Sequence, residues 1–191
     1  MKSKLKTKSI FYLLVGVGLT VTTSLWATTG LWAANDALET ISFVVDGLDK
    51  LYRVTETPHP MADSTAALCD LNYNPKIHEG TGKPAYCHVY VTRDSKESMI
   101  SGKGSYPIGT VIVKAKLENE KSKDAILFTV MRKMSQGYDS EHGDWEYSVV
   151  DGPSKRVLAS GKIDSCINCH QEYSASDYVT RIYMEPIQSK K

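Results

Sequence analysis

The sequence lacks internal repeats, low-complexity tracts and blocks of basic residues, and it has only four cysteines among its 191 residues. Without a basic block, or aromatic residues interleaved with basic ones, nothing in it predicts nucleic-acid binding. With so few cysteines, two that lie three positions apart and are followed by a histidine indicate a motif and not a chance pattern.

Acidic residues are also absent from the first 34 positions, which carry four lysines near the start and an apolar run from 10 to 26. Small residues follow at Ala27, Ala33 and Ala34. This order predicts a secretory signal peptide over residues 1–34. An uncleaved N-terminal membrane anchor is the alternative, because the run is about as long as a short membrane helix. In both cases we expect residues 35–191 to be exported to the periplasm.

Removing the first 34 positions leaves 19 basic and 22 acidic residues, a net charge of −3. The remaining chain of about 157 residues has the size of one domain with one core.

The stretch Cys166-Ile167-Asn168-Cys169-His170 has the pattern C-x-x-C-H, the attachment signature of a c-type haem. Two thiols one helical turn apart match the spacing of the two haem vinyl groups. The next residue, His170, then lies where its imidazole can ligate the iron. A redox dithiol would need a βαβ context, which the surrounding sequence does not show.

Cys69 and Cys87 remain. An even pair of cysteines in an oxidising compartment predicts a disulfide.

Alternating apolar residues predict about five strands, over 85–92, 110–117, 125–134, 145–150 and 156–159. Helical spacing predicts helices over 36–54, 64–68, 94–101 and 164–173. Short connections between the strands favour an antiparallel sheet packed with helices, with the haem motif on a C-terminal helix. The expected class is therefore α+β.

Several ordered segments resemble the cytochrome P-460 and cytochrome c′-beta family, from about Tyr52 to Tyr183. They are Ala67-Leu68-Cys69, His88–Val91, Tyr106–Lys114, Gly137-Tyr138-Asp139, Gly143–Tyr147, Cys166–His170 and Asp177-Tyr178-Val179.

This resemblance implies a homodimer and a five-coordinate iron with His170 on the proximal side. In the enzymatic branch, a lysine that corresponds to Lys114 is crosslinked to the haem macrocycle, and the protein oxidises hydroxylamine. The c′-beta branch binds nitric oxide on an apolar distal face. An enzyme would also need a redox partner protein.

Some residues have two interpretations. Lys114 is a haem crosslink or a solvated strand lysine. Glu146 is a distal acid or base, with Asp144 as second candidate, or a solvated carboxylate. Arg132 pairs with a haem propionate or lies in a solvated strand. Trp145 is expected in the core. The candidates for a distal aromatic residue are Phe43, Tyr86 and Phe128.

A six-coordinate electron carrier is the third functional alternative. His88, Met131 or Met134 would then supply the sixth ligand. His88 is more often a structural residue at such a position. We expect His59, His78 and His142 to lie in loops at the surface.

Overall fold

The computed structural model describes residues 41, 44–61 and 85–184. The expected signal peptide, the helix expected over 64–68, Cys69, His78 and Phe43 lie outside these residues. The disulfide between Cys69 and Cys87 therefore stays a prediction. Among the residues described, no helix has the length and apolar character needed to cross a membrane.

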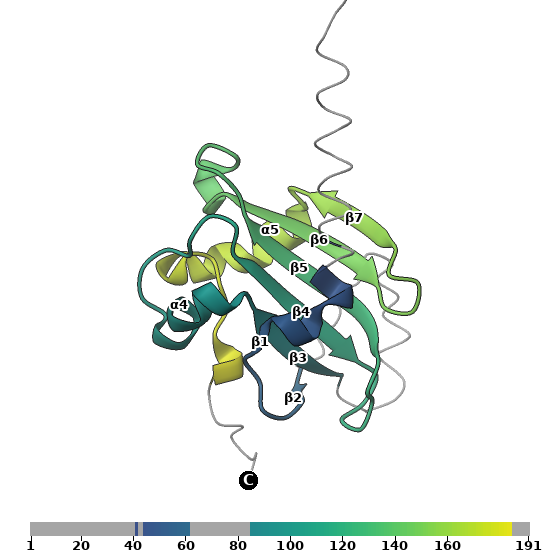
Figure 1. The fold of residues 1–191 in the computed structure, drawn as a ribbon. Coiled ribbons are helices and arrows are strands. Elements are labelled where there is room, and N and C mark those ends of the chain that lie inside the picture. Colours follow the sequence, from purple (N-terminus) through teal and green to yellow (C-terminus); the bar gives the residue numbers. More distant parts are fainter. Residues whose placement is uncertain (1–40, 42–43, 62–84, 185–191) are drawn as a thin grey trace, which may run out of the picture.

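The fold is α+β, built on one antiparallel sheet of seven strands (Figure 1). The sheet order is β1-β3-β4-β5-β6-β7, and β2 pairs with β3 beside β1. The strands are β1 (Tyr52–Arg53), β2 (His59–Pro60), β3 (Tyr86–Val91), β4 (Val111–Leu117), β5 (Ala125–Lys133), β6 (Trp145–Asp151) and β7 (Val157–Gly161). From β3 to β7 each strand pairs antiparallel with the next along the chain; residues 92–110 connect β3 to β4 through two short helices, and shorter connections join the later strands.

Short helices connect and cover these strands. They are η1 (Leu48–Lys50), η2 (Arg93–Ser95), α4 (Lys96–Ser101), η3 (Ser140–His142), α5 (Asp164–His170), η4 (Gln171–Ser176) and η5 (Ile182–Met184). The helix α4 ends at Gly102, whose left-handed backbone (φ 62°) is the usual way to stop a helix.

The two faces of the sheet pack against different elements. One face presents Val89, Ile112, Met131, Trp145 and Tyr147 to a core that α4, α5 and the C-terminal turns complete. The opposite face forms a second core with the helical segment that ends at Lys50. Figure 1 shows this segment across the sheet from α5. The buried residues of the second core are Ile41, Val45, Val111, Val113, Ala115, Phe128, Val130 and Val150.

Because both faces are covered, β4 differs from its expected pattern. The sequence predicts an apolar face and a charged, solvated face for this strand. In the structure both faces are buried: Lys116 is 3% exposed and Lys114 is half-buried. A strand in the middle of a covered sheet is enclosed on both sides whatever its alternation predicts.

The expected helix over 36–54 ends earlier than its apolar spacing predicts. Residues 41 and 44–46 are helical, Gly47 interrupts the helix, and β1 begins at Tyr52. Tyr52 pairs with Val91 of β3. Residues 52 and 53, which continue the apolar helical pattern in the sequence, therefore form a strand because they pair with β3.

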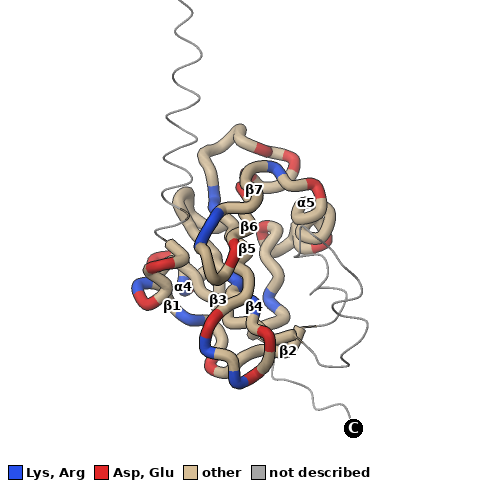
Figure 2. Tube along the Cα trace, turned by 90° about the vertical axis from the view of Figure 1, so that its right-hand side faces the viewer, with Lys and Arg blue, Asp and Glu red and all other residues tan. Residues whose placement is uncertain are grey.

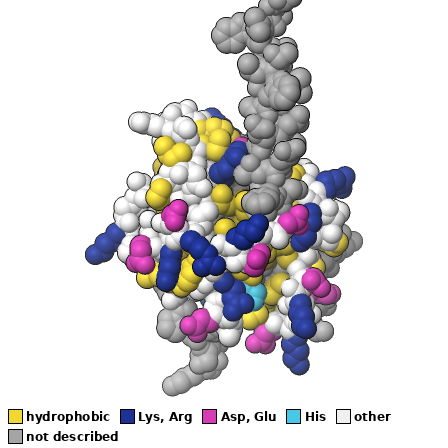
Figure 3. Space-filling model, viewed as in Figure 1, with side chains coloured by type: hydrophobic (Ala, Val, Ile, Leu, Met, Phe, Trp, Pro, Cys, Tyr) yellow, Lys and Arg dark blue, Asp and Glu magenta, His cyan; other side chains and the backbone are white. Residues whose placement is uncertain are grey.

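Charges of both signs are mixed over the described surface. Figure 2 shows acidic and basic residues together in the loop that connects β4 to β5. On the face seen in Figure 3, Lys, Arg, Asp and Glu side chains lie between small hydrophobic areas.

Candidate haem-binding site

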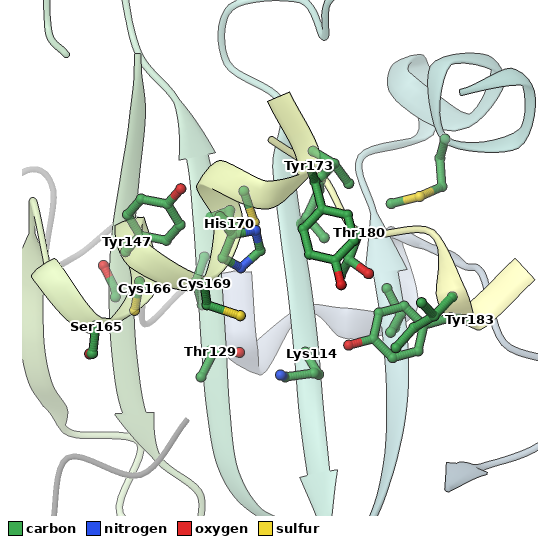
Figure 4. Close-up of a pocket in the computed structure, with 18 residues that line it drawn as sticks. Lys114, Thr129, Tyr147, Ser165, Cys166, Cys169, His170, Tyr173, Thr180 and Tyr183 are labelled. Atoms are coloured by element: carbon green, nitrogen blue, oxygen red, sulfur yellow. The ribbon is translucent and has the colours of Figure 1, made fainter. Parts of the chain in front are cut away.

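A pocket lies between the first face of the sheet and the C-terminal elements. Strands β3 to β6 form one wall, and α5, η4 and residues 179–183 form the other (Figure 4). It holds about 890 Å³ of empty space, part of it open to solvent. Apolar and polar side chains from both walls converge on this space, as is typical of ligand pockets.

The helix α5 places the whole C-x-x-C-H motif on this pocket. Cys166, Cys169 and His170 all line it. Cys166 and Cys169 are three residues apart, nearly one helical turn, so both thiols reach the pocket from the same side of α5. The structure therefore brings the three motif residues together as the sequence predicts.

His170 is oriented by a hydrogen bond from its Nδ1 to the carbonyl oxygen of Tyr178, at 2.7 Å. Its ring packs against that of Tyr147, with centroids 5.3 Å apart. Burial lowers the pKa of His170 to about 4; the bond to Tyr178 opposes this change, and the charge of Lys114 adds to it. At neutral pH the imidazole is therefore neutral. With Nδ1–H donated to Tyr178, the lone pair of Nε2 is available to a metal.

The turn that supplies this carbonyl has an uncommon backbone. Asp177 (φ 54°) and Tyr178 (φ 63°) are both left-handed. Asp visits this region more readily than most residues, whereas a bulky residue such as Tyr is strained there. Such strain costs on the order of 1–3 kcal/mol per residue and persists only where surrounding contacts fix it.

Lys114 lies in the pocket. It is opposite Thr129 of β5 and beside Val89 of β3 in the sheet register. Figure 4 shows the side chains of Lys114, Thr129 and Cys169 turned into the same space. The structure thus places Lys114 with the haem motif and not on a solvated face.

Arg132 and Glu146 are elsewhere. They are paired in the β5–β6 register on the sheet face away from the pocket, and Nη2 of Arg132 lies 2.8 Å from Oε2 of Glu146. Their neighbours Met131 and Tyr147 face the pocket, and alternation along each strand turns Arg132 and Glu146 away. This geometry does not bring Glu146 or Arg132 into the pocket, where a distal acid and a propionate partner were expected.

The other candidates for an acid or an axial ligand are distributed around the fold. The carboxylate of Asp144 accepts hydrogen bonds from the backbone N–H groups of Gly137 and Asp139 in a loop. His88 bonds to the hydroxyl of Thr55 and does not line the pocket, as expected for a structural histidine. Met131 does line the pocket and Met134 does not.

Of the aromatic residues proposed from the sequence, Tyr86 and Phe128 are not in the pocket, and Phe43 lies outside the described residues. Phe128 belongs to the second core, and Tyr86 is not among the lining residues. Trp145 is fully buried in the core, as expected. Three tyrosines line the pocket instead: Tyr147, Tyr173 and Tyr183. The alternation of β6 could have identified Tyr147; the other two lie in 3-10 turns, which leave no periodic signal.

His59 and His142 each contact a neighbouring side chain, and His59 lies in a strand and not in a loop as expected. The ring of His59, in β2, lies edge-on to that of Tyr183 at 5.3 Å. His142, in η3, lies 3.1 Å from Oδ1 of Asp139.

Two buried hydroxyl groups in the pocket bear on what it holds. Within the described residues, the side-chain oxygens of Tyr147 and Thr180 have no hydrogen-bond partner. Buried polar atoms without partners are uncommon in native proteins and often mark the place of a missing water or ligand. Together with two thiols and a neutral imidazole on one wall, they fit a covalently held haem.

A pocket lined by C-x-x-C-H against an antiparallel sheet defines a c-type haem protein. The sequence profile of the family described as Cytochrome P460 matches residues 68–181 of the chain. The chain therefore belongs to the cytochrome P460 family. A search of curated proteins finds no significant match.

Proposed function

We propose that this chain is an exported haem protein that oxidises hydroxylamine or a similar small nitrogen compound. The observation that carries the proposal is the position of Lys114, which shares one pocket with Cys166, Cys169 and His170. A lysine amine in that pocket is what the crosslink of the enzymatic branch requires.

The residues of α5 would hold the group in place. The thiols of Cys166 and Cys169 would form the thioether links, and Nε2 of His170 would ligate the iron. When bound, the haem supplies electron-transfer chemistry and an open coordination position. Val89 and Ile112 present apolar side chains to the pocket from the sheet wall, and these would limit the access of water to the bound group.

The amine of Lys114 would form the additional bond to the macrocycle. That bond replaces one N–H and one C–H hydrogen, so it is a two-electron oxidation. Hydrogen peroxide would balance it and be reduced to water. Oxidation of hydroxylamine itself releases electrons, which a redox partner protein would accept.

One observation favours a second function, reversible binding of nitric oxide. Among the described residues that line the pocket there is no Asp or Glu. An enzyme needs a group that moves protons from the substrate, and this lining offers hydroxyl groups, such as those of Tyr173 and Tyr183, instead of a carboxylate. A gas-binding protein needs no such group.

The optical spectrum of the purified ferrous protein separates these functions. We expect a Soret band strongly red-shifted from that of an ordinary c-type haem, together with hydroxylamine turnover when an artificial electron acceptor is supplied. In Lys114→Met both should be lost. Lys116→Met is the matched control, because Lys116 lies two residues further along β4 and does not line the pocket.

Two results would contradict the proposal. An ordinary high-spin c-type spectrum that Lys114→Met does not change, with nitric oxide binding and no turnover, would establish the gas-binding function instead. A low-spin six-coordinate spectrum would exclude both and point to an electron carrier, with Met131 as the first ligand to test.

A further inference from the structure

Asp177 occupies an unusual position, because both its side chain and its carbonyl group are anchored to other elements. Nζ of Lys133 lies 2.7 Å from both carboxylate oxygens, and the backbone N–H of Tyr106 donates to Oδ2 at 2.7 Å. The indole Nε1–H of Trp145 donates to the carbonyl oxygen of Asp177 at 2.8 Å.

These anchors are themselves fixed. Lys133 and Asp177 are about nine-tenths buried, with side-chain exposures of 10% and 11%. The ammonium of Lys133 also lies over the ring of Trp145, 4.9 Å from its centroid, and Trp145 is fully buried. A buried ion pair with this many hydrogen bonds favours one geometry strongly, since every alternative leaves a charge unpaired.

The residue after Asp177 is the one that holds the proximal histidine. Tyr178 accepts the Nδ1–H of His170 at its carbonyl oxygen, and its own hydroxyl donates to the carbonyl of Glu141 at 2.7 Å. Because both residues of the turn are left-handed, the carbonyl of Tyr178 keeps its direction only while the turn is held.

We propose that Asp177 is a positioning residue for His170, which with Lys133 fixes the turn at Tyr178 and thereby sets the strength of the axial bond to iron. The inference rests on the ligation of iron by His170 in the proposed function. It requires neither the Lys114 crosslink nor a particular substrate.

The physical link is the basicity of the imidazole. A well-aligned acceptor on Nδ1–H makes Nε2 a stronger donor to a metal, and loss of such a partner typically costs roughly 10–100-fold in metal affinity or activity. A stronger donor stabilises ferric iron over ferrous iron. Loosening the turn therefore weakens the axial bond and makes the reduction potential more positive.

The test uses the haem-loaded protein and two readouts, the iron–histidine stretching band in the resonance Raman spectrum and the haem midpoint potential. In Asp177→Asn we expect the band at lower frequency and a more positive potential. Asp177→Glu keeps a charge for Lys133 and should recover part of both changes. Asp151→Asn is the matched control, since Asp151 caps the β6–β7 turn through Ser154.

A second variant guards against failure of Asp177→Asn to fold. Trp145→Phe removes the bond to the Asp177 carbonyl and reduces the aromatic ring beneath Lys133, but it keeps the carboxylate pair, so both readouts should change in the same direction by less. If the loaded Asp177 and Trp145 variants have the band and potential of Asp151→Asn, the inference is overturned.

The outcomes for the two proposals are distinct. A protein without crosslink or turnover contradicts the proposed oxidation and leaves the Asp177 readouts intact. If His170→Gly changes neither the spectrum nor the potential, the ligation itself is wrong and both proposals fail.

Discussion

Arg132 and Glu146 form an ion pair on the sheet face opposite the pocket, through Nη2 at 2.8 Å and Nε at 2.9 Å from Oε2 of Glu146. Their side chains are 19% and 10% exposed, so the pair is neither a surface contact nor fully buried. Its role follows from that position: it joins β5 to β6 and has no contact with the haem motif.

We therefore predict that Glu146→Gln changes stability without changing the haem. Arg132 would lose its charged partner in a poorly solvated position, which should lower the free energy of unfolding by about 1–3 kcal/mol. Denaturant titration of the loaded protein measures this change. A shift of the Soret band or a loss of turnover in this variant would show that Glu146 does act at the haem site.

Covalent attachment of haem through Cys166 and Cys169 predicts that removing these two cysteines, but not Cys87, prevents haem retention after denaturation. Cys166→Ala combined with Cys169→Ala should abolish haem staining of the denatured protein on a gel. Cys87→Ala should keep it, because Cys87 is fully buried in the core between sheet and helices. Equal staining of the two variants would contradict the thioether links.

Gly143 and Gly137 give a matched pair of substitutions. Both have left-handed backbones, with φ 73° and 93°. A Cβ on Gly143 would come within 2.5 Å of the ring of Tyr178, whereas nothing lies within 4 Å of one on Gly137.

Gly143→Ala should therefore cost more than Gly137→Ala, by roughly 1–3 kcal/mol of unfolding free energy beyond the backbone penalty that both share. Thermal unfolding of both loaded variants makes the comparison. Equal melting temperatures would show that the ring of Tyr178 moves aside freely.

His88 predicts a pH dependence of stability. Burial lowers its pKa from the ordinary value of 6.5, the charge of Arg53 lowers it further, and a hydrogen bond to Thr55 opposes both. Since the folded state binds the proton less readily than the unfolded chain, stability should decline as the pH falls below about 6.5.

His88→Gln should reduce that decline. Unfolding free energies at several pH values between about 7 and 5, for the variant and the parent, measure the slope. An unchanged slope would mean that His88 does not contribute to the acid sensitivity.

The sheet could be predicted from the sequence because its strands are long enough to alternate. β3, β5 and β6 lie within two residues of the predicted ranges. β1 and β2 could not be predicted, since two residues carry no alternation and their pairing with β3 depends on tertiary contacts.

Some residues of the haem site could also be predicted from the sequence and others could not. Cys166, Cys169 and His170 were predictable because their spacing is local and their chemistry specific. Asp177 and Tyr178 were not, because their roles depend on a left-handed turn and on partners more than thirty residues away along the chain, Lys133, Trp145 and Glu141. Glu146 and Arg132 were misplaced because the composition of a strand does not reveal which face a cofactor uses.

Covering both faces of the sheet has a further consequence. In β3 to β6, most residues that line the pocket lie on the face of the first core, and the opposite face packs under the N-terminal segment; Val130 contributes to both. Substitutions at Val89, Ile112 or Thr129 can therefore change the size and polarity of the pocket without altering the second core. The first core both supports the fold and lines the pocket, whereas the second core lies largely outside the pocket, so the second can be kept while the pocket residues diverge.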